Sequence, residues 1–259
     1  MLLQIDHVTK AFGGVVATND VSAEFEEGKI YSIIGPNGAG KTTLFNLITG
    51  SYSMTSGSIS FNGKSIAGLK TFEINKLGIA RTFQNIRLFK QMSVLENVMT
   101  GMHSRIGHAA IDAFIPGRSK KIEEEIIEKS MEALKIVGLA DKFESGATSL
   151  PYGQQRRLEI ARALVSNPKL LLLDEPAAGM NIRESADLLE LISWINSELK
   201  KTIIFIEHNM RVVMNVSEYI YVLDHGSKIS EGTPDEVSND PLVIEAYLGR
   251  KKKGGEENA

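Results

Sequence analysis

A glycine-rich run near the N-terminus carries the clearest chemistry in this sequence. Residues 35–42 read Gly-Pro-Asn-Gly-Ala-Gly-Lys-Thr and match the pattern G-x-x-x-x-G-K-[ST] at every fixed position. Glycines let backbone N–H groups converge on phosphate oxygens in conformations that a side chain would forbid. The pattern predicts a phosphate-binding loop in which Lys41 reaches the β- and γ-phosphates of a nucleotide and the Thr42 hydroxyl ligates Mg²⁺.

The surroundings of this run favour a nucleotide site over a glycine-rich turn with a bystander lysine. An apolar run precedes the loop, and apolar residues at helical spacing follow it, so the positive end of a helix points at the phosphates. The run is not G-x-G-x-x-G, which disfavours a dinucleotide-binding fold. The residues expected to bind the nucleotide are Gly35, Pro36, Asn37, Gly38, Ala39, Gly40, Lys41, Thr42 and Thr43.

Two carboxylates directly follow a second apolar run, at residues 170–173. In an open α/β sheet, ligand-facing groups lie at the carboxyl ends of the strands. We expect Asp174 to hold Mg²⁺ through water and Glu175 to polarise the water that attacks the nucleotide. Alone, an acidic pair at this position would be an ordinary loop start. The phosphate loop upstream favours the metal and base roles.

Two further polar side chains are candidates for the same site. His208 comes just past the apolar run 203–206 and could hydrogen-bond the γ-phosphate, although a lone histidine here would more often cap a helix. Gln84 offers a neutral amide that can bind Mg²⁺ or the attacking water and release it again. The predicted catalytic residues are thus Glu175, His208 and Lys41. The predicted metal ligands are Thr42, Gln84 and Asp174.

The elements that must position these groups alternate between strand and helix. Residues 30–34, 170–173 and 203–206 are short, nearly continuous apolar runs, typical of parallel strands buried on both faces. Residues 219–223 predict a further strand. Residues 182–199 predict a crossover helix, and apolar spacing after the phosphate loop predicts another helix that ends at Gly50. This alternation indicates an α/β fold.

The N-terminal and middle parts have other patterns. Leu3, Ile5 and His7 alternate with polar residues, as do Val21, Ala23 and Phe25, which predicts half-buried strands. Residues 92–165 have a mainly helical signal, with one apolar face and an acidic face that we interpret as solvated. Residues 103–117 lack a clean period and predict a loop or an irregular insertion. Within residues 92–165, one helical face comprises Ile122, Ile126, Ser130, Leu134 and Val137.

Composition limits the function further. The 259 residues include 42% hydrophobic residues, enough for a sizeable core. The net charge of −3 gives no basic field for nucleic acid, and the absence of cysteine excludes disulfides and thiolate sites. The N-terminus does not read as a signal peptide, and the longest aliphatic run falls far short of the ~20 residues of a membrane-spanning helix. A membrane role would therefore need a partner.

The order of the motifs resembles the nucleotide-binding domain of ATP-binding cassette transporters. The phosphate loop, Gln84, the stretch 150–157, Asp174–Glu175 and His208 follow one another as in that family, over roughly residues 2–249. The resemblance implies a P-loop ATPase core with an antiparallel β subdomain and an inserted helical subdomain. It implies one domain over residues 1–250, with the core at about 1–87 and 157–250 and the helical subdomain at about 88–156. Residues 251–259 would form a disordered tail.

The resemblance also implies roles for matching residues. Phe12 would stack on adenine, Gln84 would sense Mg²⁺ and couple to a transmembrane subunit, and His208 would be the switch histidine. The stretch 150–157 would be the signature motif, in which Gly153 and Gln154 complete the site of a second copy. Gly153 and Gln154 open a helix whose apolar face is Leu158, Ala161 and Leu164, and the positive end of this helix can point at a phosphate held by another chain.

Two departures from the family pattern stand out. Pro151 and Tyr152 replace the serine and first glycine of Leu-Ser-Gly-Gly-Gln, which removes a hydroxyl and an N–H donor and weakens the expectation of tight closure. Asn181 stands where the family usually has aspartate, which bears on communication between the two sites.

The sequence is similar to the larger ATP-binding subunit of branched-chain amino-acid importers in residues 78–85, 100–120, 151–153 and 206–209. This implies the cofactors ATP and Mg²⁺, a second ATPase subunit, identical or related, and permease subunits that hold the chain at the cytoplasmic face of the membrane. Residues 231–234 and 247–249 also resemble a lipopolysaccharide-export ATPase, so lipid export stays open, as does a soluble assembly scaffold. A non-catalytic, nucleotide-gated module is disfavoured by Glu175, since a sensor needs no general base.

Overall fold

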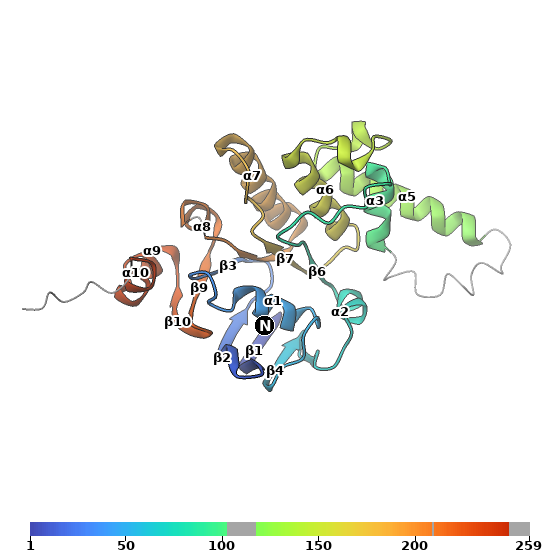
Figure 1. Cartoon of the computed structure of the whole chain (residues 1–259). Helices are drawn as coiled ribbons and strands as arrows, with labels where there is room; N and C mark the ends of the chain where they lie inside the picture. Colours follow the sequence, from blue (N-terminus) through green and yellow to red (C-terminus); the bar gives the residue numbers. More distant parts are fainter. Residues whose placement is uncertain (103–117, 209, 249–259) are drawn as a thin grey trace, which may run out of the picture.

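The strands of the protein form two sheets (Figure 1). The structure is a computed structural model that describes residues 1–102, 118–208 and 210–248. The larger sheet has the strand order β10-β9-β3-β8-β7-β6. Its strands from β9 to β6 are mutually parallel, and β10 pairs with β9 in the antiparallel sense. The strands are β3 (Ile30–Ile34), β6 (Ile79–Arg81), β7 (Leu170–Asp174), β8 (Thr202–Ile206), β9 (Tyr219–Asp224) and β10 (Ser227–Gly232).

The smaller sheet is antiparallel, with the order β2-β1-β4-β5. Its strands are β1 (Leu3–Phe12), β2 (Val15–Phe25), β4 (Ser56–Phe61) and β5 (Lys64–Ser65). Val21, Ala23 and Phe25 are buried as expected. The prediction that His7 points inward was wrong. The pairing shifts register between Ile5 and Val8, so His7 is exposed with φ +49° and Val8 takes the inward position.

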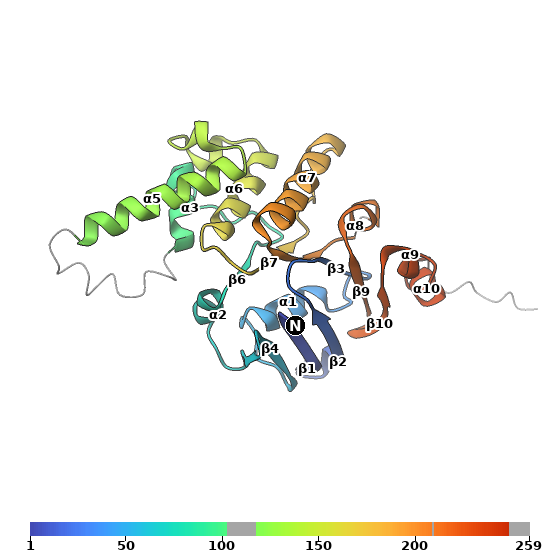
Figure 2. The same ribbon diagram turned by 180° about the vertical axis from the view of Figure 1, so that it is seen from behind.

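Helices cover both sheets and form a separate group at one end of the molecule. The α-helices are α1 (Lys41–Ile48), α2 (Thr71–Leu77), α3 (Val94–Met99), α5 (Arg118–Ile136), α6 (Tyr152–Leu164), α7 (Ile182–Leu199), α8 (Met210–Val216), α9 (Pro234–Ser238) and α10 (Pro241–Leu248). Short 3₁₀ turns are η1 (Thr100–Met102), η2 (Ala140–Lys142) and η3 (Ala147–Ser149). In both views α3, α5 and α6 gather beyond β6, while α9 and α10 lie at the opposite end (Figures 1 and 2).

The larger sheet separates two hydrophobic cores, which explains its continuous apolar strands. Leu170 and Leu172 belong to a core shared with α1 and the antiparallel sheet. Leu171 and Leu173, from the same strand, belong to a core shared with α5, α6, α7 and α8. Because successive side chains of a strand point to opposite faces, the two cores together need apolar residues at all of positions 170–173 of β7.

The helical group follows the predicted pattern. In α5, Ser130 and Leu134 are buried, Ile122 and Ile126 are partly buried, and the acidic residues are exposed. The predicted irregular insertion at residues 103–117 and the predicted disordered tail at 251–259 lie outside the described residues. Within the described part of the chain, no helix combines the length and apolar character required to span a bilayer.

Candidate nucleotide-binding site

The glycine-rich loop joins β3 to α1 at the carboxyl edge of the larger sheet, and its backbone passes close to two other segments. Gly35 has φ +145°, and a Cβ there would lie 2.0 Å from the carbonyl oxygen of Leu223. Gly40, the N-cap of α1, has φ +98°, and a Cβ there would lie 2.3 Å from the carbonyl oxygen of Ala17. Only glycine fits these two positions, because both the φ values and the space exclude a side chain.

Lys41 is folded back onto the loop that it follows. Its Nζ donates to the carbonyl oxygens of Gly35 at 2.7 Å and Pro36 at 2.9 Å, and the residue is buried. Burial lowers the pKa of Lys41, against the opposing effect of Glu175 and Asp174. The first turn of α1 holds no acidic side chain and no side-chain cap, so its N–H groups are open to an anion.

A pocket of about 270 Å³ brings together residues from distant parts of the sequence. Residues 37–43 of the loop line it, together with Gln84, Glu175 and Ala17. Residues 37–43 of the predicted phosphate loop therefore share one cavity with Gln84 and Glu175. Gly35, Pro36, Asp174 and His208 do not line it. Ala17 was missed by the sequence analysis, since a small residue in a strand has no pattern that marks it.

Glu175 lies between Gln84 and His208. Gln84 Nε2 donates to Glu175 Oε2 at 2.8 Å, and His208 Nδ1 lies 3.8 Å from the same oxygen. Glu175 has φ +46°, a left-handed conformation that costs on the order of 1–3 kcal/mol in a non-glycine residue. Its N–H donates to the Ile206 carbonyl oxygen, which fixes this turn against the end of β8. The strained turn aims the carboxylate into the pocket.

Asp174 is held by a residue that the sequence analysis did not single out. Its side chain is buried, and Oδ2 accepts a hydrogen bond from Arg81 Nη2 at 2.8 Å. Arg81 also donates through Nη1 to Asn46 of α1. Burial raises the pKa of Asp174, and the Arg81 guanidinium opposes that rise. No pattern in a single sequence reveals which cation will pair with a buried carboxylate.

The second oxygen of Asp174 fits a hydrated divalent ion. Among the described residues, Asp174 Oδ1 is buried without a hydrogen-bond partner, and a buried carboxylate oxygen is costly to leave unpaired. Thr42 and Gln84 line the adjacent pocket with a hydroxyl and an amide. The described part of the chain holds no cluster of three or more His, Cys, Asp or Glu residues suited to a metal. This donor set suits Mg²⁺, which keeps several waters and takes few protein ligands.

Phe12 lies apart from the phosphate pocket. It ends β1, and the residue is 43% exposed. Tyr52 meets it edge to face, with ring centroids 5.1 Å apart, and Lys10 Nζ lies 4.8 Å from its centre. Phe12 does not line the pocket that holds Gln84 and Glu175. The ring presents an accessible aromatic surface.

The signature residues line a different pocket of the same chain. Gly153 and Gln154 open onto a cavity of about 410 Å³ that also involves Pro151 and Arg157, and this cavity shares no lining residue with the phosphate pocket. The helix begins one residue earlier than predicted, at Tyr152. Leu158, Ala161 and Leu164 are buried as expected. The expected signature residues and the phosphate loop thus lie in separate cavities of one chain.

Asn181 serves a local structural purpose. Its Oδ1 accepts from the N–H of Glu184 at 2.9 Å, and Glu184 Oε2 accepts from the N–H of Asn181 at 3.1 Å. This reciprocal pair is a capping box at the start of α7. Asparagine caps a helix as well as aspartate, so the departure from the family pattern keeps the helix start intact.

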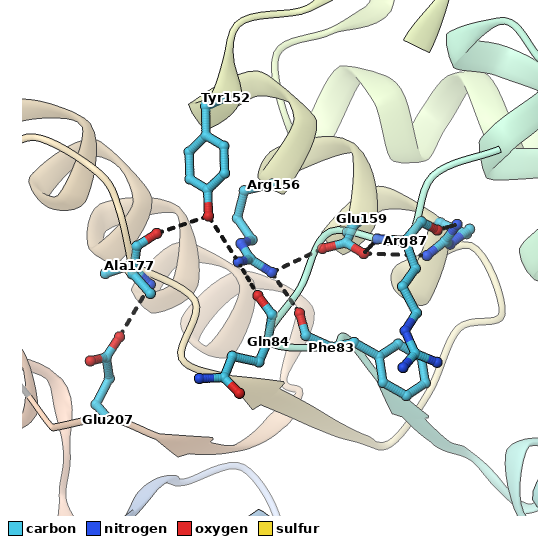
Figure 3. A network of polar contacts seen from close by, with 10 residues as sticks. Phe83, Gln84, Arg87, Tyr152, Arg156, Glu159, Ala177 and Glu207 are labelled. Atoms are coloured by element: carbon cyan, nitrogen blue, oxygen red, sulfur yellow. Dashed lines mark hydrogen bonds and ion pairs between the residues drawn. The ribbon is translucent and has the colours of Figure 1, made fainter. Parts of the chain in front are cut away.

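Helix α6, which begins with the signature residues, also forms hydrogen bonds with the loop that contains Gln84, as Figure 3 shows. Arg156 donates to the carbonyl oxygens of Phe83 and Gln84, both at 2.7 Å. Glu159 accepts from the N–H of Arg87 at 2.7 Å. This network was not predicted, because side chains that bind main-chain groups leave no complementary residue type in the sequence.

The C-terminal helix reaches the phosphate loop from the other side. The Tyr247 hydroxyl of α10 accepts a hydrogen bond from the N–H of Gly35 at 2.9 Å. A cavity of about 590 Å³ separates the rest of the loop from α10 and is lined by Pro36, Asn37, Leu242 and Glu245, among others. Residues far apart in sequence thus support the loop at Gly35.

Comparisons with known proteins agree with this geometry. A family model described as ABC transporter matches residues 18–178, and one described as branched-chain amino acid ATP-binding cassette transporter matches residues 227–253. The high-affinity branched-chain amino acid transport ATP-binding protein LivG of Salmonella typhimurium is 42% identical over 249 residues, which is 96% of this chain and 98% of LivG.

Solved structures give the same result. A nucleotide-free ATP-binding cassette from an ABC transporter superposes with a TM-score of 0.84 at 33% identity, covering 96% of this chain and 99% of that one. A dimeric cassette in a post-hydrolysis state, bound to ADP and phosphate, has a TM-score of 0.75 at 27% identity and covers 90% and 99% of the two chains. The fold class predicted from the sequence is confirmed. The chain belongs to the ATP-binding cassette family of transporter proteins and is an ATPase of that family.

Proposed function

We propose that this chain hydrolyses ATP to power the import of branched-chain amino acids through transmembrane permease subunits at the cytoplasmic face of a membrane. One observation carries the ATPase part: the phosphate loop, Gln84 and Glu175 line a single pocket. The cargo is supported by the relative that transports these amino acids and by the family match at residues 227–253. Lipid export and a scaffold role have no comparable support.

Glu175 is our candidate for the general base. Its carboxylate lies within the pocket, and Gln84 and His208 flank the same oxygen. This oxygen can accept a proton from water that attacks the γ-phosphate, while His208 contacts the phosphate and Gln84 orients the water. Lys41 must leave the carbonyl oxygens of Gly35 and Pro36 to reach the phosphates, and we assign it to stabilising their charge.

Mg²⁺ would be held by Asp174, Thr42 and Gln84. The unpaired Oδ1 of Asp174 supports this assignment, since a coordinated water would supply its missing hydrogen bond. The ion would neutralise charge on the phosphates of bound ATP. We assign the other loop residues from Gly35 to Thr43 to nucleotide binding, with residues 37–43 lining the phosphate pocket. We assign Phe12 to the adenine ring, for which its exposed surface is suited.

A second ATPase subunit, identical or related, would complete the site. Gly153 and Gln154 lie in a separate cavity of their own chain, so they would contact nucleotide bound to the partner. The dimeric cassette structure is a precedent for such pairing. The start of α6 keeps its helix dipole for this contact, although Pro151 supplies neither a hydroxyl nor an N–H.

The permease would dock in a largely apolar groove of about 610 Å³ beside residues 81–83. Phe72, Phe83 and Ile74 line it, and Phe72 is 50% exposed. An amphipathic helix of a transmembrane subunit suits a groove of this kind. We further infer one domain over residues 1–250, in which the core at about 1–87 and 157–250 carries the inserted helical subdomain at about 88–156.

Uptake by a reconstituted complex tests the proposal. The chain would be co-purified with candidate permease subunits and placed in liposomes containing ATP. We expect ATP-dependent uptake of leucine, isoleucine or valine, and none with Glu175→Gln. Hydrolysis of ATP without uptake of any of the three would refute the assigned cargo while leaving the ATPase intact.

A further inference from the structure

Three side chains of α6 hold the main chain of residues 83–87. Arg156, Glu159 and Arg162 are spaced so that they lie on one face of the helix. Arg156 donates to the carbonyl oxygens of Phe83 and Gln84, Glu159 accepts from the N–H of Arg87, and Arg162 donates to the Arg87 carbonyl oxygen. All four bonds involve backbone groups, so the helix fixes the path of this segment whatever its side chains are (Figure 3).

The segment needs such support because it has no regular structure of its own. Residues 82–89 belong to no helix or strand. The Arg156 and Glu159 side chains are fully buried and form an ion pair at 2.9 Å. Buried ion pairs add little net stability, because desolvation offsets the attraction between the charges. The pair is better explained by the position that it imposes on residues 83–87.

That position matters for the candidate base. Arg156 Nη2 donates to the main-chain oxygen of Gln84, and the side chain of Gln84 donates to Glu175. Two hydrogen bonds therefore connect the signature helix to the carboxylate in the phosphate pocket. A displacement of Arg156 along the helix axis would move the Gln84 amide relative to Glu175.

Arg156 also contacts the start of α6. Its Nη2 also donates to the Tyr152 hydroxyl at 3.4 Å, and Tyr152 in turn donates to the Ala178 carbonyl oxygen at 3.0 Å. Ala178 lies three residues after Glu175, whose carbonyl oxygen accepts from the Ala178 N–H. Gly153 follows Tyr152 directly. Figure 3 shows the Arg156 guanidinium between Tyr152 and the main chain of Gln84. This guanidinium thus joins the surface assigned to a second subunit's nucleotide with the residue that contacts this subunit's own base.

We propose that Arg156 is a positioning residue that couples the two sites: contact between the start of α6 and the partner's nucleotide sets the position of Gln84 in this subunit's own pocket. The proposal rests on the proposed function, because it requires ATP hydrolysis by paired subunits. It assigns Tyr152, which replaces a glycine of the usual signature, to the same connection.

A double-mutant cycle on the full-length chain tests the coupling. We expect Arg156→Met to lower kcat for MgATP by about tenfold or more with KM changed less than about twofold, because misplacement affects the reacting geometry more than binding. Gln84→Ala should have a similar effect, and the double variant should be no slower than Gln84→Ala alone. Multiplicative losses in the double variant would overturn the proposal, since Arg156 would then act independently of Gln84.

Two further variants separate position from charge and from folding. Arg156→Lys keeps the cation but cannot span both carbonyl oxygens, so full recovery of kcat with lysine would also overturn the proposal. Tyr152→Phe removes one exposed hydroxyl and is expected to fold. It therefore tests the connection even if the Arg156→Met protein fails to fold. It should lower kcat in the same direction, and its effect should vanish in the Gln84→Ala background.

Hydrogen exchange supplies a readout that does not depend on turnover. When two Glu175→Gln subunits pair in the presence of ATP, amide exchange in residues 83–88 should slow. Adding Arg156→Met to this variant should raise that exchange by about tenfold, although the subunits remain paired. Lys135→Met, which removes an exposed cation from the same group of helices, is the control. Equal exchange in the Arg156→Met and control proteins would refute the coupling.

The controls distinguish a failure of this coupling from a failure of the proposed function. Lys41→Ala should abolish nucleotide binding. If the wild-type chain neither binds nor hydrolyses ATP, the proposed function fails. If it does both and only the cycle is multiplicative, the coupling alone fails.

Discussion

Arg81 and Asp174 form an ion pair at 2.8 Å, and their side chains are only 6% and 2% exposed. The guanidinium is further held by Asn46 and lies 5.4 Å and 5.2 Å from the ring centres of Phe45 and Phe83. The pair thus links α1, the carboxyl end of β7 and the segment that carries Gln84. It leaves one oxygen of Asp174 without a partner among the described residues, on the atom proposed for hydrated Mg²⁺.

We predict that Arg81→Met destabilises the protein by about 3–5 kcal/mol, because it leaves the carboxylate of Asp174 buried and uncompensated. Asp174→Asn alone should also destabilise, since it leaves the Arg81 cation without its counter-charge. The double variant Arg81→Met/Asp174→Asn removes both charges and should recover much of the loss. Urea unfolding of the four proteins measures these free energies, and additive losses in the double variant would contradict the pairing.

Glu175→Gln should bind ATP normally and lose turnover. Glutamine preserves the size of the side chain and can still contact Gln84, but it cannot accept a proton from water at neutral pH. We expect kcat to fall by at least about a hundredfold with nucleotide affinity nearly unchanged. Equilibrium binding and phosphate release measure the two effects separately. Substantial steady-state hydrolysis by this variant would exclude the base role.

Much of this site could be predicted because its residues follow apolar strands. Buried parallel strands read as continuous apolar runs, and their carboxyl ends meet at one edge of the sheet. The positions of the phosphate loop, Asp174–Glu175 and His208 at strand ends could therefore be predicted from the sequence alone. Each prediction needed only a strand end and a chemically apt residue.

The remaining contacts depend on tertiary packing. Arg81 and Asn46 reach Asp174 from other elements, and the left-handed turn at Glu175 has no glycine to mark it. Arg156 and Tyr247 bind main-chain groups, so no complementary side chain in the sequence marks these contacts. The inward position of His7 was predicted wrongly because a register shift changes which side chains face the core.

Without nucleotide, the isolated chain should be monomeric. The signature residues and the phosphate pocket share no lining residue within one chain, so ATP must bridge two subunits to bring them together. We expect Glu175→Gln to elute as a dimer from a sizing column with ATP, alone or with a related ATPase, and as a monomer after ATP is removed. A stable nucleotide-free dimer through the same surface would contradict this arrangement.

His7 should give a pH-dependent contribution to stability. A hydrogen bond from its Nδ1 to Asp20, 2.7 Å long, raises the pKa of His7 above its ordinary value of 6.5, and the Asp20 charge adds to this. A raised folded pKa stabilises the protein fully below the unfolded value, and this stability is lost as pH rises through the folded value. The melting temperature of wild type should exceed that of His7→Gln at pH 5.5 and match it at pH 8.5. An equal difference at both pH values would exclude the ion pair.

Tyr247→Phe tests whether the C-terminal helix supports the phosphate loop. The phenol oxygen is the acceptor for the N–H of Gly35, and phenylalanine fills the same space without it. We expect the free energy of unfolding to fall by about 1 kcal/mol, because that N–H loses its hydrogen bond. Gly35 starts the loop and lies before the N–H groups that α1 turns toward the phosphates. The bond should therefore persist when ATP binds, and the loss of stability should be equal with and without saturating nucleotide. Tyr52→Phe, which removes the phenol oxygen of a ring that packs on Phe12, is the control. A Tyr247→Phe protein as stable as wild type would show that α10 gives the loop no support.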